Sequence, residues 1–335
     1  MPSTAEIRVG PAGWSYQDWK RIVYPDARPR HFHEAAYLAR YFDTIEINTS
    51  FYRPLRPELS RLWVRKIESN PRFRFTAKLY RGFTHEGRLE TDDVQQFREG
   101  LAPIVESGRL GCVLMQFPWS FKFNRENREY LVRLKKTFPE HALVAEMRHG
   151  SWASDEAIGV FIDHHIGFCN IDQPQFSHSL PPMAVATTPI GYVRLHGRNY
   201  KEWFEHPEEA GKDPDALPHI AARYNYLYSM EELGEWKGRI EQVAGQARST
   251  YVITNNHYEG KAVANAIQLI HLLIGEPVET PPDLLNFYPE LATISKNAPQ
   301  QGNLFADNGK GASRRDPAKT PAEPASASIA NRRFR

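Results

Sequence analysis

Polar side chains that can do chemistry recur in this sequence at every second position of short apolar segments. Three segments have this spacing: Glu46-Ile-Asn48, Glu146-Met-Arg148 and Arg194-Leu-His196-Gly-Arg198. In an extended strand alternate residues share one face, so each segment presents its polar side chains to the same side. Carboxylates and imidazoles exchange protons, and guanidinium groups bind carboxylate or phosphate oxygens through paired hydrogen bonds. The three segments therefore favour acid/base chemistry on an anionic ligand.

Other apolar segments also end in polar residues, which are Lys78, Gln116, Asp172, Asn255 and Asn256, and the loop after Lys78 carries His85. A single glutamate at a strand end is more often a cap or an ion-pair partner than a catalyst. Polar ends on most of the segments are harder to explain in that way, because unpaired buried charges are costly. We therefore expect a polar pocket where these ends meet.

The segments themselves predict strands, and the longer periodic stretches between them predict helices. The predicted strands are Ile7–Gly13, Thr44–Asn48, Phe73–Leu79, Leu110–Phe117, Ala142–Arg148, Gly167–Asp172, Gly191–Gly197 and Thr250–Asn255. The predicted helices are Glu34–Tyr41, Glu58–Glu68, Asp92–Ser107, Glu126–Thr137, Ser154–His164, Met230–Ala247 and Lys261–Ile274. Between the sixth and seventh strands, residues 173–190 lack a helical pattern.

Strands that are nearly all followed by helices indicate parallel βαβ units. Residues 1–297 suit a closed (β/α)8 barrel, in which catalytic groups project from the carboxyl ends of the strands. An open doubly wound sheet is the competing architecture. It would normally carry a glycine-rich phosphate fingerprint after the first strand, and Gly10-Pro-Ala-Gly13 is not one. We predict an α/β protein with a single TIM-barrel domain over residues 1–297.

Aromatic residues follow several predicted strands: Trp14, Tyr16, Trp19, Phe51, Tyr52, Trp119, Trp152 and Trp203. A rim of rings can stack on sugars or nucleobases, although core packing explains some of these residues. The candidate ligand-binding residues are therefore Trp14, Asn48, Tyr52, Lys78, Gln116, Arg148, Asp172, Arg194, Arg198, Asn255 and Asn256.

Composition bounds the class of protein. The 335 residues are 41% hydrophobic and 24% charged, which is typical of globular chains and excludes a fully disordered or fibrous one. The 2 cysteines cannot form a disulfide framework or a Cys-based zinc cluster. No run approaches the roughly 18 apolar residues of a membrane span, and Met1–Gly10 lacks a signal-peptide pattern. We expect a cytoplasmic protein without membrane contact.

Residues 298–335 are rich in Pro, Ala, Ser, Asn and Arg and predict a disordered tail. The tail contains seven of the 42 basic and three of the 40 acidic residues, so residues 1–297 have a net charge of −2. The net charge of +2 for the whole chain therefore comes from a basic tail. A slightly acidic barrel gives no support for binding long nucleic acid, and any cationic site in it must be local.

Within the tail, Gln301-Gly-Asn-Leu304-Phe305 resembles the bacterial sliding-clamp-binding pentapeptide, in which Gln, Leu and Phe are the anchors. A disordered peptide of this kind orders on binding and places its apolar side chains in a pocket. Gly302 departs from the usual large apolar second residue, and a linker remnant is the alternative. The sliding clamp is therefore an expected partner only through the tail.

Several longer motifs are shared with one family: Gly10-Pro-Ala-Gly-Trp-Ser-Tyr16, Glu46-Ile-Asn-Thr-Ser-Phe-Tyr52, Gln116-Phe-Pro118, Glu146-Met-Arg-His-Gly-Ser-Trp152, Tyr192-Val-Arg-Leu-His-Gly-Arg198 and Asn255-Asn256. Over residues 7–274 the chain resembles the YecE-like proteins, domain-of-unknown-function family 72. Ser50 stands where Thr is expected, and Gly150 is an unusual neighbour for Ser151. The resemblance implies a TIM-barrel-like fold and no established reaction.

The first enzymatic interpretation is metal-free. Four cations would hold a small anionic or phosphate-bearing ligand: Lys78, Arg148, Arg194 and Arg198, the last two as a clamp. Glu46 or Glu146 would act as the general base, and His196 as an acid or an orienting group. We favour this interpretation and predict no cofactor, with the hydrolase and isomerase/lyase classes ahead of other reactions.

Two alternatives remain open at this point. In the first, a divalent metal would activate water in an endonuclease- or isomerase-like hydrolase linked to DNA metabolism, held by Glu46, Glu146, Asp172 and His196. Against it, no tight ligand spacing such as HExxH occurs, and the nearby arginines would repel a cation. In the second alternative, the chain only binds a ligand or nucleic acid. The substrate and the oligomeric state do not follow from the sequence.

Overall fold

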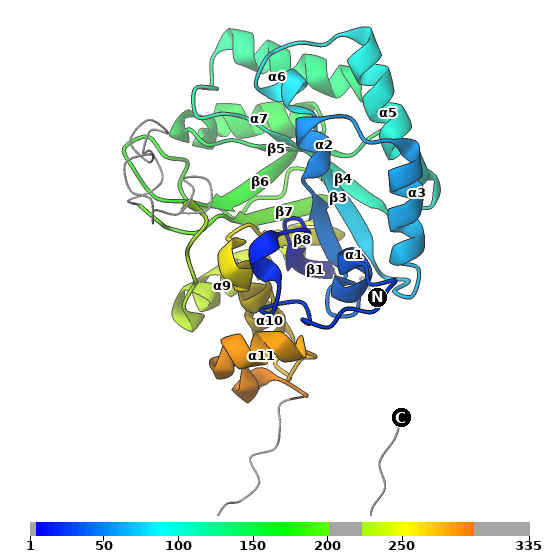
Figure 1. The fold of residues 1–335 in the computed structure, drawn as a ribbon. Helices are drawn as coiled ribbons and strands as arrows, with labels where there is room; N and C mark the ends of the chain where they lie inside the picture. The colour runs from blue at the N-terminus through cyan, green and yellow to red at the C-terminus, as the bar shows by residue number, and fades with distance from the viewer. Residues whose placement is uncertain (1–4, 201–222, 298–335) are drawn as a thin grey trace, which may run out of the picture. The chain divides into compact units, whose positions relative to one another are not determined.

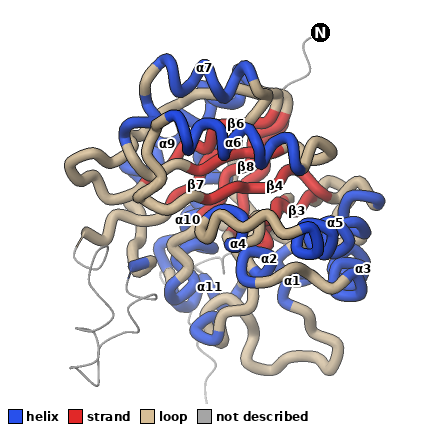
Figure 2. The backbone as a smooth tube through the Cα atoms, turned by 90° about the horizontal axis from the view of Figure 1, so that it is seen from above, coloured by secondary structure: helices blue, strands red, loops and turns tan. Residues whose placement is uncertain are grey.

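The computed structural model describes residues 5–200 and 223–297, in which parallel strands form a ring inside an outer layer of helices (Figures 1 and 2). The strands are β1 (Glu6–Pro11), β2 (Thr44–Ile47), β3 (Arg74–Lys78), β4 (Leu110–Gln116), β5 (Leu143–Glu146), β6 (Gly167–Asp172), β7 (Ile190–Leu195) and β8 (Ser249–Thr254). Their order in the sheet is β1-β8-β7-β6-β5-β4-β3-β2. The predicted TIM-barrel fold is confirmed.

The ring closes between β1 and β2 through a short contact instead of a full ladder. The N–H of Gly13 donates to the carbonyl oxygen of Glu46 at 2.9 Å, and Ala12 forms an isolated parallel bridge with Glu46. Gly10 permits this approach, because a Cβ there would lie 1.9 Å from the carbonyl oxygen of Thr44. The backbone of Glu46 is thereby fixed at the seam of the barrel.

Helices follow most strands, as the periodicity predicts. They are α1 (Glu34–Leu38), α2 (Thr49–Tyr52), α3 (Pro57–Lys66), α4 (Arg81–Thr84), α5 (Thr91–Glu106), α6 (Arg125–Thr137), α7 (Asp155–Asp163), α9 (Met230–Gln246), α10 (Lys261–Ile274) and α11 (Pro282–Phe287). The 3-10 helices are η1 (Gln17–Trp19), η2 (Gly150–Ala153), η4 (Tyr258–Gly260) and η5 (Pro289–Ile294). Residues 173–190 contain no helix, in agreement with the prediction.

Local sequence explains where the longer helices begin. Ser229 caps α9 through a reciprocal pair of hydrogen bonds with Glu232, and Asn124 and Ser154 cap α6 and α7. The sequence analysis misses α2 and α4, because four residues are too few to establish a helical period. It also misses α11, which begins at Pro282 beyond the last predicted helix.

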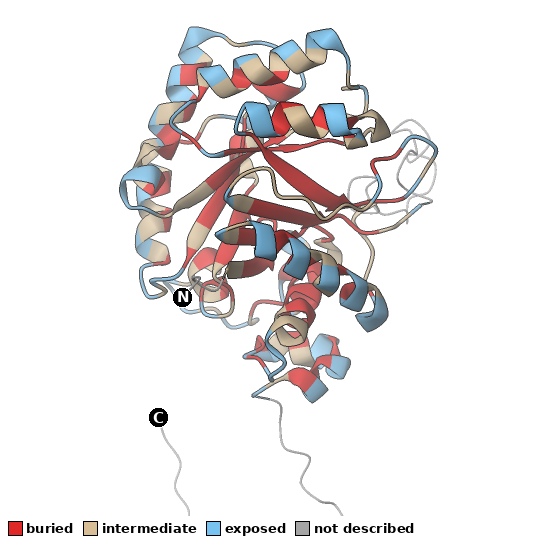
Figure 3. Ribbon diagram, turned by 180° about the vertical axis from the view of Figure 1, so that it is seen from behind, coloured by how far each residue is buried: buried red, intermediate tan, exposed pale blue. Residues whose placement is uncertain are grey.

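The strands are buried along most of their length, whereas the outer faces of the helices are exposed (Figure 3). Inside the barrel, the rings of Tyr192 on β7 and Tyr251 on β8 lie 6.2 Å apart between centroids. The barrel interior is thus filled by side chains, and polar chemistry is confined to its ends. Within the described ranges, no helix is both long and apolar enough to cross a membrane.

Candidate functional site

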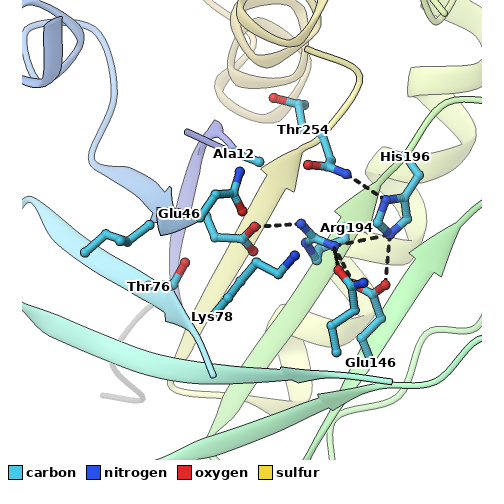
Figure 4. A network of polar contacts seen from close by, with 12 residues as sticks. Ala12, Glu46, Thr76, Lys78, Glu146, Arg194, His196 and Thr254 are labelled. Carbon is cyan, nitrogen blue, oxygen red and sulfur yellow. Dashed lines mark hydrogen bonds and ion pairs between the residues drawn. The ribbon is translucent and has the colours of Figure 1, made fainter. Parts of the chain in front are cut away.

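Arg194, on β7, is the centre of a polar network at the carboxyl ends of the strands (Figure 4). Its guanidinium group donates to Glu46 on β2 and to Glu146 on β5, each at 2.6 Å, and to Gln116 on β4 at 3.4 Å. Arg194 is 1% exposed and both carboxylate side chains are fully buried. Residues separated by about 150 positions in the sequence therefore converge within hydrogen-bond distance.

Tyr192, which the sequence analysis does not identify as a site residue, supports this network from below. Its hydroxyl donates to Glu46 Oε2 at 2.9 Å and lies 2.9 Å from Thr76 Oγ1 on β3. Tyr192 stands two residues before Arg194, so both face the barrel interior. The alternation of β7 could have revealed it. Glu46 is consequently held between a guanidinium group and a phenol.

Glu146 is bound from three directions. Arg148 lies 2.7 Å and His196 Nε2 3.2 Å from Glu146 Oε1, while Arg194 contacts Oε2. Burial alone would raise the pKa of Glu146, but these neighbours outweigh it and hold that pKa well below its usual range. Glu146 is therefore an ionised carboxylate that accepts a proton only weakly.

His196 is fully buried, and Asn255 Nδ2 lies 2.9 Å from its Nδ1. Burial, reinforced by Arg148, lowers the pKa of His196 to about 3. The ring is neutral near pH 7, with Asn255 donating to Nδ1 and Nε2 donating to Glu146. The role of His196 as an imidazolium acid is corrected by this geometry, whereas a role in orienting Glu146 agrees with it.

Lys78, at the end of β3, extends toward Arg194 between the two carboxylates (Figure 4). It is 8% exposed, and its ammonium nitrogen lies 4.1 Å from the centroid of the Phe51 ring. Among the described residues, it has neither an ion pair nor a hydrogen bond. Burial lowers the pKa of Lys78 to about 8, and Arg194 acts in the same direction. Lys78 is therefore a buried amine that titrates close to neutral pH.

The charges of the cluster do not balance. Two ionised carboxylates face Arg148 and Arg194, and His196 is neutral, so protonated Lys78 adds one uncompensated positive charge. This local excess lies in a domain whose overall sequence charge is slightly negative. The cluster therefore favours a negatively charged ligand.

A cavity of about 270 Å³ opens beside the cluster. Its lining includes Arg148 and Arg223, the amides of Gln116 and Gln173, and no Asp or Glu among the described residues: His85, Gln116, Phe117, Pro118, Trp119, Arg148, Gln173, Arg223 and Tyr224. Of these, Gln116 and Arg148 are hydrogen-bonded to the cluster itself. The cavity therefore has cationic walls beside the buried network.

A larger cavity, of about 770 Å³, lies on the other side of His85 and Pro118, which line both spaces. Its wall includes three carboxylates, on Glu86, Glu126 and Glu129, against a single arginine, Arg133. The acidic lining makes this space a poor match for an anion. Size alone therefore does not identify the site.

Asp172 and Arg198 lie outside the cluster. Arg198 binds Asp172 at 2.8 Å and Glu232, in the first turn of α9, at 2.9 Å. The expected clamp of Arg194 with Arg198 is corrected by these contacts, because each guanidinium group already binds carboxylates of the chain itself. Arg198 instead ties the end of β7 to β6 and α9.

The remaining predicted residues divide between two places. Trp14, Asn48 and Tyr52 line a separate cavity of about 430 Å³ near the seam between β1 and β2. Asn256 is buried and donates to Tyr226 O and to Asn265 Oδ1 at 2.8 and 2.7 Å. Asn256 therefore fixes α10 against the segment before α9 and does not face the cluster.

The expected aromatic rim is only partly present. Trp19 and Trp152 are fully buried in the core, whereas Trp119 lines the 270 Å³ cavity. Trp203 lies outside the described residues, as do the predicted tail at 298–335 and its Gln301, Leu304 and Phe305. Core packing therefore explains two of these tryptophans.

The alternative metal site does not form from its four expected ligands. Arg194 separates Glu46 from Glu146, and Arg198 holds Asp172. In the described ranges, no three or more His, Cys, Asp and Glu side chains are grouped so that they could hold a metal ion. The donor set present thus fits paired guanidinium groups better than a cation.

Known proteins resemble this chain over the whole barrel. UPF0759 protein YunF of Bacillus subtilis is 28% identical over 283 residues, which are 80% of this chain and 94% of that protein. A DUF72 family protein from Thermotoga maritima is 33% identical with a TM-score of 0.66, covering 80% of this chain and 99% of its own. One from Enterococcus faecalis is 24% identical with a TM-score of 0.68, covering 80% and 95%. The family model described as protein of unknown function DUF72 matches residues 8–285, and the chain belongs to this family.

Proposed function

We propose that this chain is an enzyme that performs acid/base chemistry on a small anionic ligand at the carboxyl ends of the barrel strands. The proposal rests chiefly on the 270 Å³ cavity, whose described lining combines two arginines, two glutamines and no carboxylate. Guanidinium groups bind carboxylate and phosphate oxygens bidentately, and amides complete such a shell. A space of this size suits a ligand of a few heavy atoms more than a polymer.

Arg148 is the cation best placed to serve both the ligand and the cluster. It lines the cavity, pairs with Glu146 at 2.7 Å and donates to Gln173 Oε1 at 3.2 Å. Its side chain retains 11% exposure, compared with 1% for Arg194. Ligand oxygens would meet Arg148 first, while Arg194 maintains the positions of the two glutamates.

Proton transfer would fall to Lys78 more than to the glutamates. A general acid or base works best when its pKa lies near the working pH, and the pKa of Lys78 is lowered to about 8. Glu146 has the opposite property, because its cationic neighbours keep it ionised. In this arrangement Glu46 and Glu146 orient the cations, and His196 orients Glu146.

Calorimetric titration with inorganic phosphate tests the binding step. We expect saturable binding to the wild-type chain and at least tenfold weaker binding to Arg148→Gln. The matched control is Arg125→Gln, which removes an 84% exposed arginine on α6 and should leave the affinity unchanged. Equal affinity for the two variants, or no phosphate binding by the wild-type chain, would contradict the proposal.

A binding protein without catalysis is distinguished by proton exchange. In D2O, proton NMR of a mixture of small hydroxy acids and sugar phosphates would show loss of specific C–H signals with the wild-type chain. Lys78→Met should abolish that exchange while phosphate still binds. Phosphate binding without any exchange would indicate a binding function instead.

A further inference from the structure

The buried cations of the barrel differ in how they are compensated. Arg194 pairs with two carboxylates, and Arg8, 5% exposed at the opposite end, pairs with Glu6 at 2.6 Å. Lys78 is buried to a similar degree, yet among the described residues its one close polar partner is the face of the Phe51 ring. A buried amine without a carboxylate partner is unfavourable for the fold, so a use for the nitrogen itself has to be considered.

The surroundings of Lys78 favour its neutral form. Arg194 and Arg148 repel a positive charge on the amine, and burial removes the water that would stabilise that charge. A pKa of about 8 leaves roughly one molecule in ten with a free amine at pH 7, and about half at pH 8. A desolvated lysine beside other cations is the usual form of an amine nucleophile.

The groups that imine chemistry needs lie next to this amine. Glu46 and Glu146 act on Lys78 electrostatically, and both are fully buried carboxylates. Lys78 in turn acts on His85, whose pKa burial and Lys78 together lower to about 4, and His85 lines the 270 Å³ cavity. Lys78 thus lies beside the space whose walls carry Arg148 and Arg223, which can hold the acidic end of the same ligand.

We propose that the Lys78 amine forms an imine with the aldehyde or ketone carbon of a small anionic ligand bound against Arg148 and Arg223. The inference rests on the proposed function and narrows its substrate class to carbonyl compounds bearing a carboxylate or phosphate. The nitrogen attacks the carbonyl carbon and loses a proton, while the carbonyl oxygen gains one, giving a carbinolamine. Loss of the hydroxyl group with a further proton releases water and leaves the C=N bond. No oxidant or reductant is required.

Reductive trapping on the full-length wild-type chain tests the imine. Two matched pairs of probes separate the carbonyl group from the charge: pyruvate with acetone, and glycolaldehyde phosphate with glycolaldehyde. With cyanoborohydride present, we expect peptide mapping to find the adduct at Lys78 at least ten times faster than at any other lysine. The anionic member of each pair should label Lys78 at least tenfold faster than its neutral partner.

Variants and competition sharpen the assignment. Inorganic phosphate should protect Lys78, and Arg148→Gln should slow labelling by the anionic probes but not by the neutral ones. Lys136→Arg, which changes an exposed lysine on α6, should leave labelling at Lys78 unchanged. Because the adduct is located in the wild-type chain, the test does not depend on whether a Lys78 variant folds.

The outcomes separate the two proposals. Uniform labelling of all lysines, or none at Lys78 with any of the four probes, overturns the imine. If phosphate nevertheless binds in an Arg148-dependent way, the proposed function stands without it. If no anion binds and Lys78 is not trapped, both proposals fail. Equal labelling of Lys78 by charged and neutral probes overturns the anionic substrate class.

Discussion

The two ends of the barrel use buried and half-buried cations in different ways. At the amino ends of the strands, Arg109 donates to three carbonyl oxygens, of Asn70, Pro71 and Phe73, at 2.8, 2.8 and 3.1 Å. Arg74 donates to two of the same carbonyls, and Arg8 donates to Arg72 O. These arginines hold the loop before β3 onto the barrel. Their partners are backbone groups that no ligand can replace.

At the carboxyl ends, the cations bind side chains instead. Arg148 and Arg194 meet carboxylates that can change protonation state, Lys78 has no carboxylate partner among the described residues, and a cavity adjoins the group. The difference teaches where charge serves the fold and where it is available for chemistry. In TIM barrels, function lies at the carboxyl ends and stability at the amino ends.

The strongest test of the comparison is removal of Arg194. Arg194→Met leaves Glu46 and Glu146 buried without their shared partner, and breaking a buried ion pair from one side costs about 3–5 kcal/mol. We expect the free energy of unfolding, measured by urea denaturation at pH 7, to fall by about that amount. A loss below about 1 kcal/mol would mean that the carboxylates are compensated by other groups or by water.

Replacing Lys78 should have the opposite sign. Its pKa is lowered to about 8 from a model value of 10.5, so between these values the unfolded chain binds more protons than the folded one. Wild-type stability therefore rises through this window relative to Lys78→Met. We expect Lys78→Met to be more stable than the wild type by up to about 3 kcal/mol below pH 8, with the difference vanishing above pH 10.5.

Urea denaturation of both chains from pH 7 to 11 measures this difference. Using the variant as reference cancels the titration of tyrosines and other lysines. A difference that does not depend on pH would show that Lys78 has an ordinary pKa. A stabilising substitution that abolishes chemistry is the behaviour expected of a functional residue.

The smallest effect is expected at the amino end of the barrel. Arg109→Met removes hydrogen bonds to three carbonyls that water can partly replace, and we expect a loss of about 1–2 kcal/mol in the free energy of unfolding. Phosphate affinity, measured by calorimetry, should not change. A tenfold loss of affinity in Arg109→Met would erase the functional distinction between the two ends.

Much of the fold follows from the sequence because strand and helix periods are local. The eight strands lie within one or two residues of the predicted ends, and α10 begins and ends at the predicted residues. Glu46, Glu146, Arg194 and His196 are predicted together because parallel strands bring their carboxyl ends to one face. The elements that escape, such as α4, are too short to show a period.

The partners of each polar residue could not be predicted in the same way. Arg194 and Arg198 have identical positions in the alternating pattern of β7, yet one lies in the cluster and the other binds Asp172 and Glu232. Which carboxylate each arginine meets depends on the tilt of strands and the placement of α9. Those relations are not visible in a spacing of two.

By itself, the sequence determined that this chain forms a barrel of parallel strands with acidic and basic residues at their carboxyl ends, because hydrophobic periodicity is written residue by residue. Only the tertiary structure decided that Arg194 neutralises both glutamates, that His196 is neutral and that Lys78 has no carboxylate partner among the described residues. The reason is physical: burial and charge pairing depend on distances between strands that are far apart in the chain. Protonation state, and with it any chemistry, is set by those distances.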